Sequence, residues 1–217
     1  MVQMPNPITK NTLVRKSSGL VRDHLPSNLE ILRLLSQDSE ILPLIKFLIF
    51  TGARLGEVLH LEWDDIEDGV WMIKSKPNCM TKEGIGWAPK WEKSRMIPLL
   101  REAQDVLDSQ KRISNWVFPK KDDSRSDSLS SAWVTMKREG IENLQLKDFR
   151  NWFNQHIKHE LQFTTKEAAS YLGHCPKVNE THYEPISKER MTLKLNSQSL
   201  AATNLLQSLR NNSRYDS

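Results

Sequence analysis

Apolar positions recur at helical spacing in the first quarter of the chain. Ser27, a residue type that caps helix N-termini, is followed by leucines spaced for one helical face between residues 29 and 35. A second helix is predicted over residues 40–50, where most positions are apolar, and Thr51-Gly52 ends it. Residues 54–61 then begin another short helical segment.

The pattern changes after Asp68-Gly69. Residues 70–73 (VWMI) favour a β-strand because they are β-branched, aromatic or apolar. Residues 76–86 contain one proline and two glycines and predict a long loop. Further strands are expected at 87–90 and 95–99. Together these segments predict a small antiparallel sheet of about three strands inserted into a helical protein.

The second half of the chain is again mostly helical in pattern. Residues 115–119 read as a short extended piece and residues 120–128, charged and rich in serine, as an exposed loop. Thr164 and Glu167 have the spacing of a capping box. The predicted helices are 99–110, 128–139, 147–160 and 164–172. The fold class is therefore expected to be α+β, mainly α-helical, with the small sheet inserted after Arg54.

Charge and cysteine content narrow the class of protein. The formal net charge is +4, which is compatible with a polyanionic partner because phosphate contacts use Lys and Arg. Cys79 and Cys175 lie far apart and form no CxxC pair, which argues against a disulfide framework or a zinc cluster and for a reducing compartment. No apolar run is long enough to span a bilayer, and residues 1–10 hold no apolar signal core. A cytoplasmic location is expected.

Four separated segments hold the residues best suited to chemistry. Each segment is short and weak as a signal by itself, so their order and spacing matter more than any one of them. A tyrosine, Tyr183, follows the last segment nine positions after its histidine. The segments are Thr51–Val58 (TGARLGEV), Trp87–Leu99 (WAPKWEKSRMIPL), Lys147–Arg150 (KDFR) and Leu172–His174 (LGH).

In this order and spacing the chain resembles the tyrosine recombinase family, of the phage integrase kind, from about residue 29 to Tyr183. The resemblance implies an integrase-type catalytic domain fold and an enzyme that cleaves and rejoins DNA strands. It implies that Arg54 and Arg150 are the two catalytic arginines and Tyr183 the nucleophile. It also implies that His174 is catalytic and that Glu57 supports Arg54.

Two lysines complete the implied site. Lys90 matches the family's β-hairpin lysine, since it lies eight residues before Pro98, although Lys82 and Lys93 lie nearby. Lys147 stands where the family usually has histidine. A lysine is a poor base at neutral pH unless burial lowers its pKa, so a hydrogen bond to phosphate is its expected contribution.

The chemistry of phosphodiester cleavage agrees with these residue types. Two arginines supply planar, charged forks for the non-bridging oxygens, on which negative charge grows in the transition state. A free tyrosine has a pKa of about 10 and needs a nearby base or a cationic field to attack. The leaving 5′-hydroxyl needs a proton, for which Lys90 is the candidate general acid.

No cofactor is expected. A covalent 3′-phosphotyrosyl link would keep the energy of the broken bond, and the sequence has neither a GxxxxGK[ST] phosphate loop nor acidic residues clustered for two metal ions. His156 and His159 are spaced for one helical face, but a histidine pair without a third ligand is more often solvated than metal-binding.

The expected organisation has three parts: an arm or interdomain linker at 1–26, the catalytic domain at 27–186, and a C-terminal tail at 187–217. Leucines in the tail fit contacts with a second protomer or packing on its own domain, and both options stay open. The implied partners are double-stranded DNA, further copies of the chain in a dimer or tetramer, and accessory DNA-bending proteins. The implied location is the nucleoid of a bacterial, archaeal or phage-infected cell.

Two other functions fit the same residues. A type IB topoisomerase would use this site to relax supercoils without exchanging strands between partners. A DNA-binding remnant of an integrase would bind without cutting, which the lysine at position 147 and the short segment before residue 27 both allow. The intact set of the other catalytic positions argues against the remnant. The hairpin segment around Lys90, which resembles that of integrases, favours the recombinase over the topoisomerase.

Overall fold

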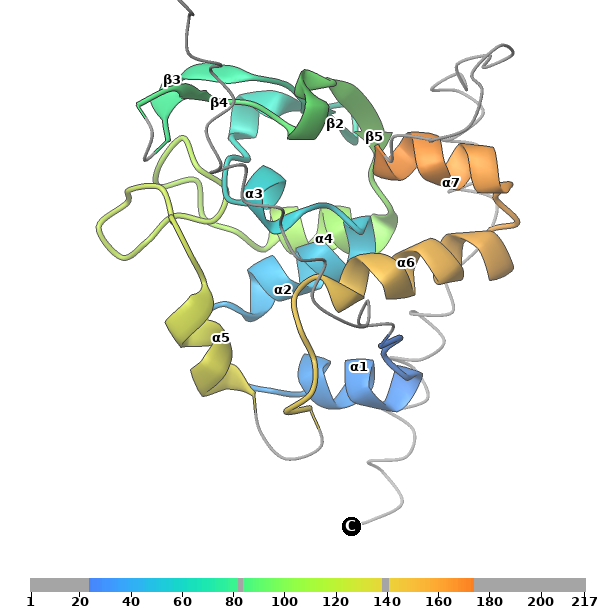
Figure 1. Cartoon of the computed structure of the whole chain (residues 1–217). Coiled ribbons are helices and arrows are strands. Elements are labelled where there is room, and N and C mark those ends of the chain that lie inside the picture. The colour runs from blue at the N-terminus through green and yellow to red at the C-terminus, as the bar shows by residue number, and fades with distance from the viewer. Residues whose placement is uncertain (1–23, 82–83, 138–140, 174–217) are drawn as a thin grey trace, which may run out of the picture.

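The structure is a computed structural model, and it describes residues 24–81, 84–137 and 141–173. Seven α-helices and five short strands fall within these ranges (Figure 1). The helices are α1 (Asn28–Leu35), α2 (Leu42–Thr51), α3 (Leu55–Val58), α4 (Arg101–Asp108), α5 (Ser130–Met136), α6 (Asp148–His159) and α7 (Thr165–Leu172). The strands are β1 (Ile66–Glu67), β2 (Val70–Ile73), β3 (Lys76–Met80), β4 (Gly86–Trp87) and β5 (Arg95–Pro98). The expected α+β class, mainly helical with a small antiparallel sheet, is confirmed.

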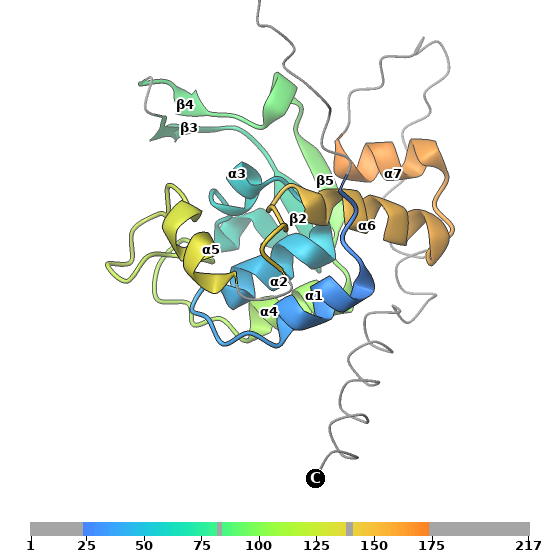
Figure 2. The same ribbon diagram turned by 60° about the horizontal axis from the view of Figure 1, so that its bottom comes forward.

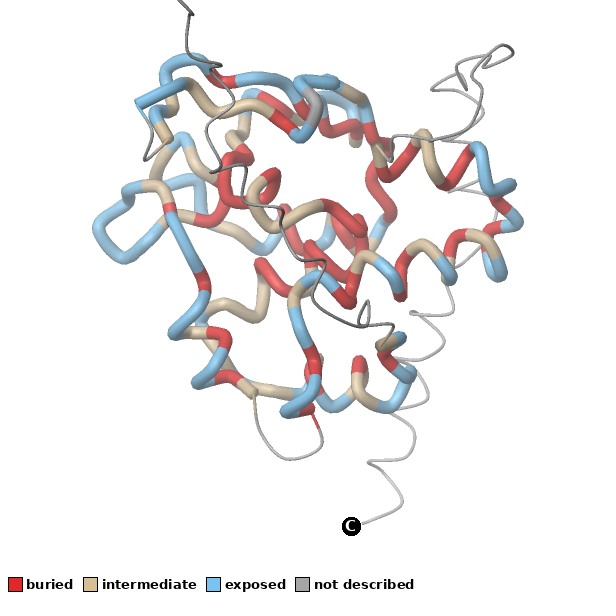
Figure 3. The backbone as a smooth tube through the Cα atoms, in the orientation of Figure 1, coloured by how far each residue is buried: buried red, intermediate tan, exposed pale blue. Residues whose placement is uncertain are grey.

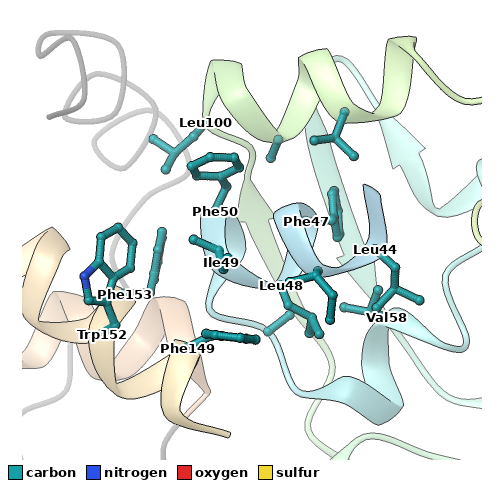
Figure 4. Packing of buried hydrophobic residues seen from close by; sticks show 14 of the residues in the cluster. Leu44, Phe47, Leu48, Ile49, Phe50, Val58, Leu100, Phe149, Trp152 and Phe153 are labelled. Carbon is teal, nitrogen blue, oxygen red and sulfur yellow. The ribbon is translucent and has the colours of Figure 1, made fainter. Parts of the chain in front are cut away.

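Helix α2 forms the centre of the hydrophobic core. Seven of its ten residues are buried, which is the signature of a helix surrounded by other elements rather than lying on a surface. It packs against α4 on one side and α6 on another. Figure 4 shows Phe149 and Phe153 of α6 facing Leu48 and Ile49 of α2. The tube in Figure 3 is buried along most of α2 and becomes exposed toward the outer loops.

The three-stranded sheet has the order β1-β2-β5, and all neighbours are antiparallel. Its two faces differ as alternation requires: Met72 and Met96 lie opposite one another and are exposed. On the other face the buried Ile73 lies opposite Arg95. The register therefore turns an arginine toward the interior of the protein.

The helix caps follow the sequence closely. Ser27 caps α1 and Thr164 caps α7, each with the complete capping box that its spacing indicates. Helix α2 begins at Leu42, two residues later than expected, because Pro43 occupies its first turn, where a missing N–H costs nothing. Residues 120–128 form the expected loop, exposed except at Arg125 and Ser126.

The prediction of a long loop over residues 76–86 is wrong. Residues Lys76–Met80 and Gly86–Trp87 pair as β3 and β4 in a separate two-stranded sheet. A Cβ at position 86 would lie 2.6 Å from the Pro77 Cα, so glycine here allows two backbones to approach rather than marking a loop. Figure 2 shows this hairpin extending away from helices α2 and α6.

The predicted strand at 87–90 is also wrong beyond Trp87. Pro89 starts a 3₁₀ turn, η2 (Lys90–Glu92), because its fixed φ suits the residue before a helical turn. The three-stranded sheet is completed instead by β1, which the sequence pattern did not indicate. A two-residue strand is too short to show an alternating pattern.

Candidate active site

A buried carboxylate organises the region around the first arginine of the expected site. Glu57 lies on α3 and is 2% exposed. Its oxygens accept hydrogen bonds from the Arg54 backbone N–H at 2.8 Å and the Arg54 Nη1 at 2.9 Å. They also accept from Arg95 Nη1 at 2.9 Å and Arg95 Nη2 at 2.8 Å. Four donors fill the acceptor sites of an ionised carboxylate.

The charge of Glu57 follows from these contacts. Burial by itself would raise the pKa of this carboxyl, because a low-dielectric surrounding disfavours the charged form. The hydrogen bonds and positive charges of Arg95 and Arg54 outweigh burial and lower the pKa below its ordinary value. Glu57 is therefore an anion held between two cations at neutral pH.

The turn that delivers Arg54 depends on glycine. Gly52 ends α2 in the left-handed conformation, with φ at 59°. A Cβ there would lie 2.5 Å from a ring carbon of Phe153 and 2.9 Å from Leu172, so α6 and α7 leave no room for a side chain. The chain passes between these helices and places Arg54 at the N-cap of α3.

Three arginines converge on the C-terminal end of α7. Arg95 Nε donates to the carbonyl of Tyr171 at 3.1 Å, and Arg54 Nη2 donates to that of Gly173 at 3.0 Å. Arg150 Nη2 donates to the carbonyl of Leu172, between these two. The last carbonyls of a helix have no partner within it and carry partial negative charge, so they are natural acceptors for cations.

Arg150 reaches this point from the first turn of α6. Its Nη1 also donates to the carbonyl of Gly52 at 2.9 Å, so one fork joins the end of α2 to the end of α7. Burial, together with the charges of Arg54 and Arg95, lowers the pKa of Arg150 to about 9, while Glu57 opposes this shift. Arg150 thus stays charged at neutral pH in a place that already holds two cations.

We call Arg54, Glu57, Arg95 and Arg150 the Glu57 cluster. These four side chains carry three positive charges and one negative charge, so the cluster favours an added anion. Arg54 is the better placed to meet one, because its side chain is 26% exposed whereas that of Arg95 is 11% exposed. The arrangement suits a group with charged, hydrogen-bond-accepting oxygens.

Lys90 lies on a different element, the exposed 3₁₀ turn after β4. The base of the hairpin before it is fixed to the body of the protein. The Trp87 ring stacks on His60, with centroids 4.3 Å apart and planes 11° apart, and the buried Lys76 forms ion pairs with Glu62 and Asp65. Trp87, three residues before Lys90, is therefore held in place, and the turn that carries Lys90 follows from this fixed residue.

Lys147 lies at the N-cap of α6 and is exposed. It precedes Arg150 by three residues, a spacing that places both on the same side of the helix. An exposed ammonium at this position suits a contact to a phosphate oxygen.

His174 and Tyr183 lie outside the described residues. The structure describes the chain up to Gly173, the residue before His174. Gly173 has a left-handed backbone conformation, with φ at 64°. A Cβ on Gly173 would lie 2.9 Å from Arg95 Nη1, so the glycine lets the arginine pack flat against the backbone. This explains the glycine of the LGH segment in physical terms.

Arg95 is the residue that the sequence reading missed, although it opens the RMIPL stretch. The signal available in the sequence was alternation: Arg95 stands two positions before the apolar Ile97, so both lie on the same face of the strand, and Ile97 is buried. An arginine on the inward face of a strand needs partners, and here they are Glu57 and the end of α7.

The two histidines considered for a metal have different surroundings. His156 stacks on Trp152, with centroids 5.0 Å apart, whereas His159 is exposed. The described part of the chain has no group of three or more His, Cys, Asp or Glu side chains placed to hold a metal ion.

Among residues 24–81, 84–137 and 141–173, no helix is long and apolar enough to cross a membrane.

The sequence model of the phage integrase family matches residues 23–189, which include every segment of the expected site. The chain belongs to the phage integrase family. No curated protein sequence matches it.

Solved structures show the fold of this family member. A lambda integrase dimer bound to a COC′ core site is 18% identical, with a TM-score of 0.56 over 81% of this chain and 65% of that one. The integrase of mycobacterium phage Brujita is 16% identical, with a TM-score of 0.59 over 82% of this chain and 58% of that one. The Tn1549 transposon integrase in complex with circular intermediate DNA is 16% identical, with a TM-score of 0.55 over 86% and 66%. The chain thus spans less than two thirds of the length of these integrases.

Proposed function

We propose that this chain is a site-specific DNA recombinase that cleaves and rejoins strands through a covalent 3′-phosphotyrosyl intermediate. The observation that carries the proposal is the convergence of Arg54 and Arg150 beside one buried glutamate, at the end of the helix that leads in sequence to His174 and Tyr183. A scissile phosphate supplies the anion that the Glu57 cluster favours.

In the proposed reaction the Tyr183 oxygen forms a bond to phosphorus as the bond from phosphorus to the 5′-oxygen breaks. Arg54 and Arg150 bind the non-bridging oxygens and stabilise their growing charge. The phenol proton leaves to His174, and Lys90 protonates the departing 5′-oxygen. Lys147 contributes a hydrogen bond to the phosphate. Reversal with a different 5′-hydroxyl rejoins the strands without an external energy source.

The proposed partner is double-stranded DNA, bound by a dimer or tetramer of the chain, with accessory DNA-bending proteins assisting. The support comes from the integrases above, which are described as a dimer on a core site and as a complex with circular intermediate DNA. Residues 27–186 are proposed as the catalytic domain, 1–26 as an arm and 187–217 as a tail that contacts a neighbouring protomer. The protein would act in the cytoplasm, at the nucleoid.

The first step of the test supplies a DNA site. A pool of duplexes with a random central segment is selected for retention by the Tyr183→Phe protein, which keeps the arginines but has no nucleophile. The selected duplex is then prepared with a nick near the cleaved position, so that the short product diffuses away and the covalent complex accumulates.

Wild-type protein is expected to form an adduct with this nicked duplex that survives denaturation, and Tyr183→Phe none. Tyr215→Phe, a matched change of another tyrosine, keeps the adduct. A wild-type protein that forms no adduct contradicts the proposal and favours a DNA-binding remnant. Relaxation of a supercoiled plasmid without strand exchange between two duplexes favours a topoisomerase instead.

A further inference from the structure

Arg95 uses every nitrogen of its guanidinium inside the protein. Nη1 and Nη2 donate to the two oxygens of Glu57, and Nε donates to the carbonyl of Tyr171. The side chain is 11% exposed. This arginine is therefore committed to protein groups, in contrast to the more exposed Arg54.

The contacts of Arg95 fix the plane of the Glu57 carboxylate. Each oxygen of Glu57 accepts one hydrogen bond from Arg95 and one from Arg54: Oε1 from the two Nη1 atoms, and Oε2 from Arg95 Nη2 and the Arg54 backbone N–H. A carboxylate held from one side by a bidentate fork presents fixed acceptor positions on the other. The orientation of the Arg54 guanidinium therefore depends on Arg95 through Glu57.

The same arginine also holds the end of α7. Its Nε binds the carbonyl of Tyr171, and its guanidinium lies against Gly173, where a Cβ would come within 2.9 Å of Nη1. Gly173 accepts in turn from Arg54 Nη2. Strand β5, helix α3 and the end of α7 meet at this one side chain.

We propose that Arg95 is a positioning residue for strand transfer, which orients Arg54 through Glu57 and fixes the end of α7 from which the chain continues to His174. The proposal rests on the proposed function. Arg95 does not touch the phosphate in this account. It acts by keeping Arg54 and the end of α7 in one fixed geometry.

Arg95 has this role because its planar guanidinium donates to both oxygens of Glu57 at once, and not only because it is positively charged. A lysine at position 95 keeps the positive charge beside Glu57 but is a point donor on a flexible stem, and it cannot bind both Glu57 oxygens and the Tyr171 carbonyl in fixed directions. Arg95→Lys is thus the informative variant. Arg101→Lys, a change of an exposed arginine six residues along the chain, is the matched control.

The first arm of the test needs no DNA. In the ¹⁵N-labelled protein, the hydrogen bonds of Arg54 are expected to slow rotation of its guanidinium group, so that its Nη protons give separate NMR signals. These signals are assigned by their loss in Arg54→Lys. In Arg95→Lys these signals average or disappear, and in Arg101→Lys they persist. Arg54 signals unchanged in a folded Arg95→Lys protein would overturn the proposal. If circular dichroism shows that Arg95→Lys does not fold, Arg95→Gln, which keeps a single NH₂ donor group and no fork, takes its place.

The second arm measures strand cleavage on the selected, nicked duplex. Arg95→Lys is expected to slow adduct formation about 100-fold in a single turnover, because a small misplacement of catalytic groups has effects of that order. Affinity for the intact duplex is expected to change less than about threefold, since Arg95 makes no phosphate contact in this account.

A double-mutant cycle separates positioning from general loss of structure. In a Glu57→Gln background, Arg95→Lys is expected to slow adduct formation less than about fivefold, because the path through Glu57 is already broken and only the contact with the Tyr171 carbonyl is still lost. Equal slowing in both backgrounds would overturn the proposal. If the wild type forms no adduct, the proposed function fails, and the NMR arm by itself decides whether Arg95 orients Arg54.

Discussion

Arg95 and Glu57 are 38 positions apart in the sequence, yet they meet through two hydrogen bonds of 2.9 and 2.8 Å. The glutamate is almost fully buried, and the arginine comes from the inward face of β5. This pair joins the three-stranded sheet to helix α3, whose N-cap is Arg54. Its geometry predicts how substitutions at Glu57 and at neighbouring positions change the stability of the protein.

Glu57→Gln is expected to lower the free energy of unfolding by about 3–5 kcal/mol, because it leaves two arginine side chains without their carboxylate. The effect has a defined pH dependence. The pKa of Glu57 is lowered in the folded state, so its stabilisation is present above its ordinary value of 4.5 and is lost as pH falls through the lowered folded-state pKa.

Urea denaturation between about pH 7 and pH 3 measures this dependence. Stability of the wild type is expected to fall more steeply below about pH 5 than stability of Glu57→Gln, since only the wild type loses the charge of this carboxylate. Parallel pH profiles for the two proteins would mean that Glu57 is not the anion described here.

Gly173→Ala is expected to destabilise the protein more than Gly84→Ala, although both glycines have positive φ, at 64° and 74°. A Cβ at position 84 meets nothing within 4 Å, so only the backbone cost of about 1–2 kcal/mol applies. At position 173 the Cβ also overlaps Arg95, adding about 1–3 kcal/mol. Equal losses of unfolding free energy would show that Arg95 does not pack on Gly173.

Lys90→Ala is expected to slow cleavage of the selected duplex about 10²–10⁴-fold, the usual contribution of a general acid. The same variant is expected to cleave at the wild-type rate when the leaving 5′-oxygen is replaced by sulfur. The sulfur departs as a thiolate and needs no proton, because the pKa of a thiol is only about 8.5. Lys93→Ala serves as the control from the same turn region. A Lys90→Ala defect that sulfur does not relieve would assign the proton to another group.

The sequence predicts those features of the fold that depend on interactions between neighbouring residues, such as helix caps. Ser27 and Thr164 cap their helices because a side-chain oxygen three residues before a glutamate satisfies free N–H groups wherever the helix packs. Local patterns are sufficient for these two caps. The roles expected for Arg54 and Arg150 depend instead on the order and spacing of four segments, and the structure brings both side chains to the end of α7.

Contacts between segments that are distant in the sequence cannot be predicted from local patterns. Gly86 looked like a loop residue, and only its approach to Pro77 shows that it belongs to a strand. Lys76, which the sequence pattern places in a loop, is buried because it forms ion pairs with Glu62 and Asp65. Arg95 could be assigned a role only once the register placed it opposite Ile73 and beside Glu57.

The most direct test of the central claim is to identify the amino acid that carries DNA in the covalent complex. Trypsin places the three tyrosines in three different peptides: residues 167–177 hold Tyr171, 178–188 hold Tyr183, and 215–217 hold Tyr215. After nuclease and trypsin digestion of the adduct, mass spectrometry is expected to find the nucleotide on the 178–188 peptide, attached to Tyr183. A nucleotide on either of the other two peptides, or an adduct that Tyr183→Phe still forms, would contradict the account.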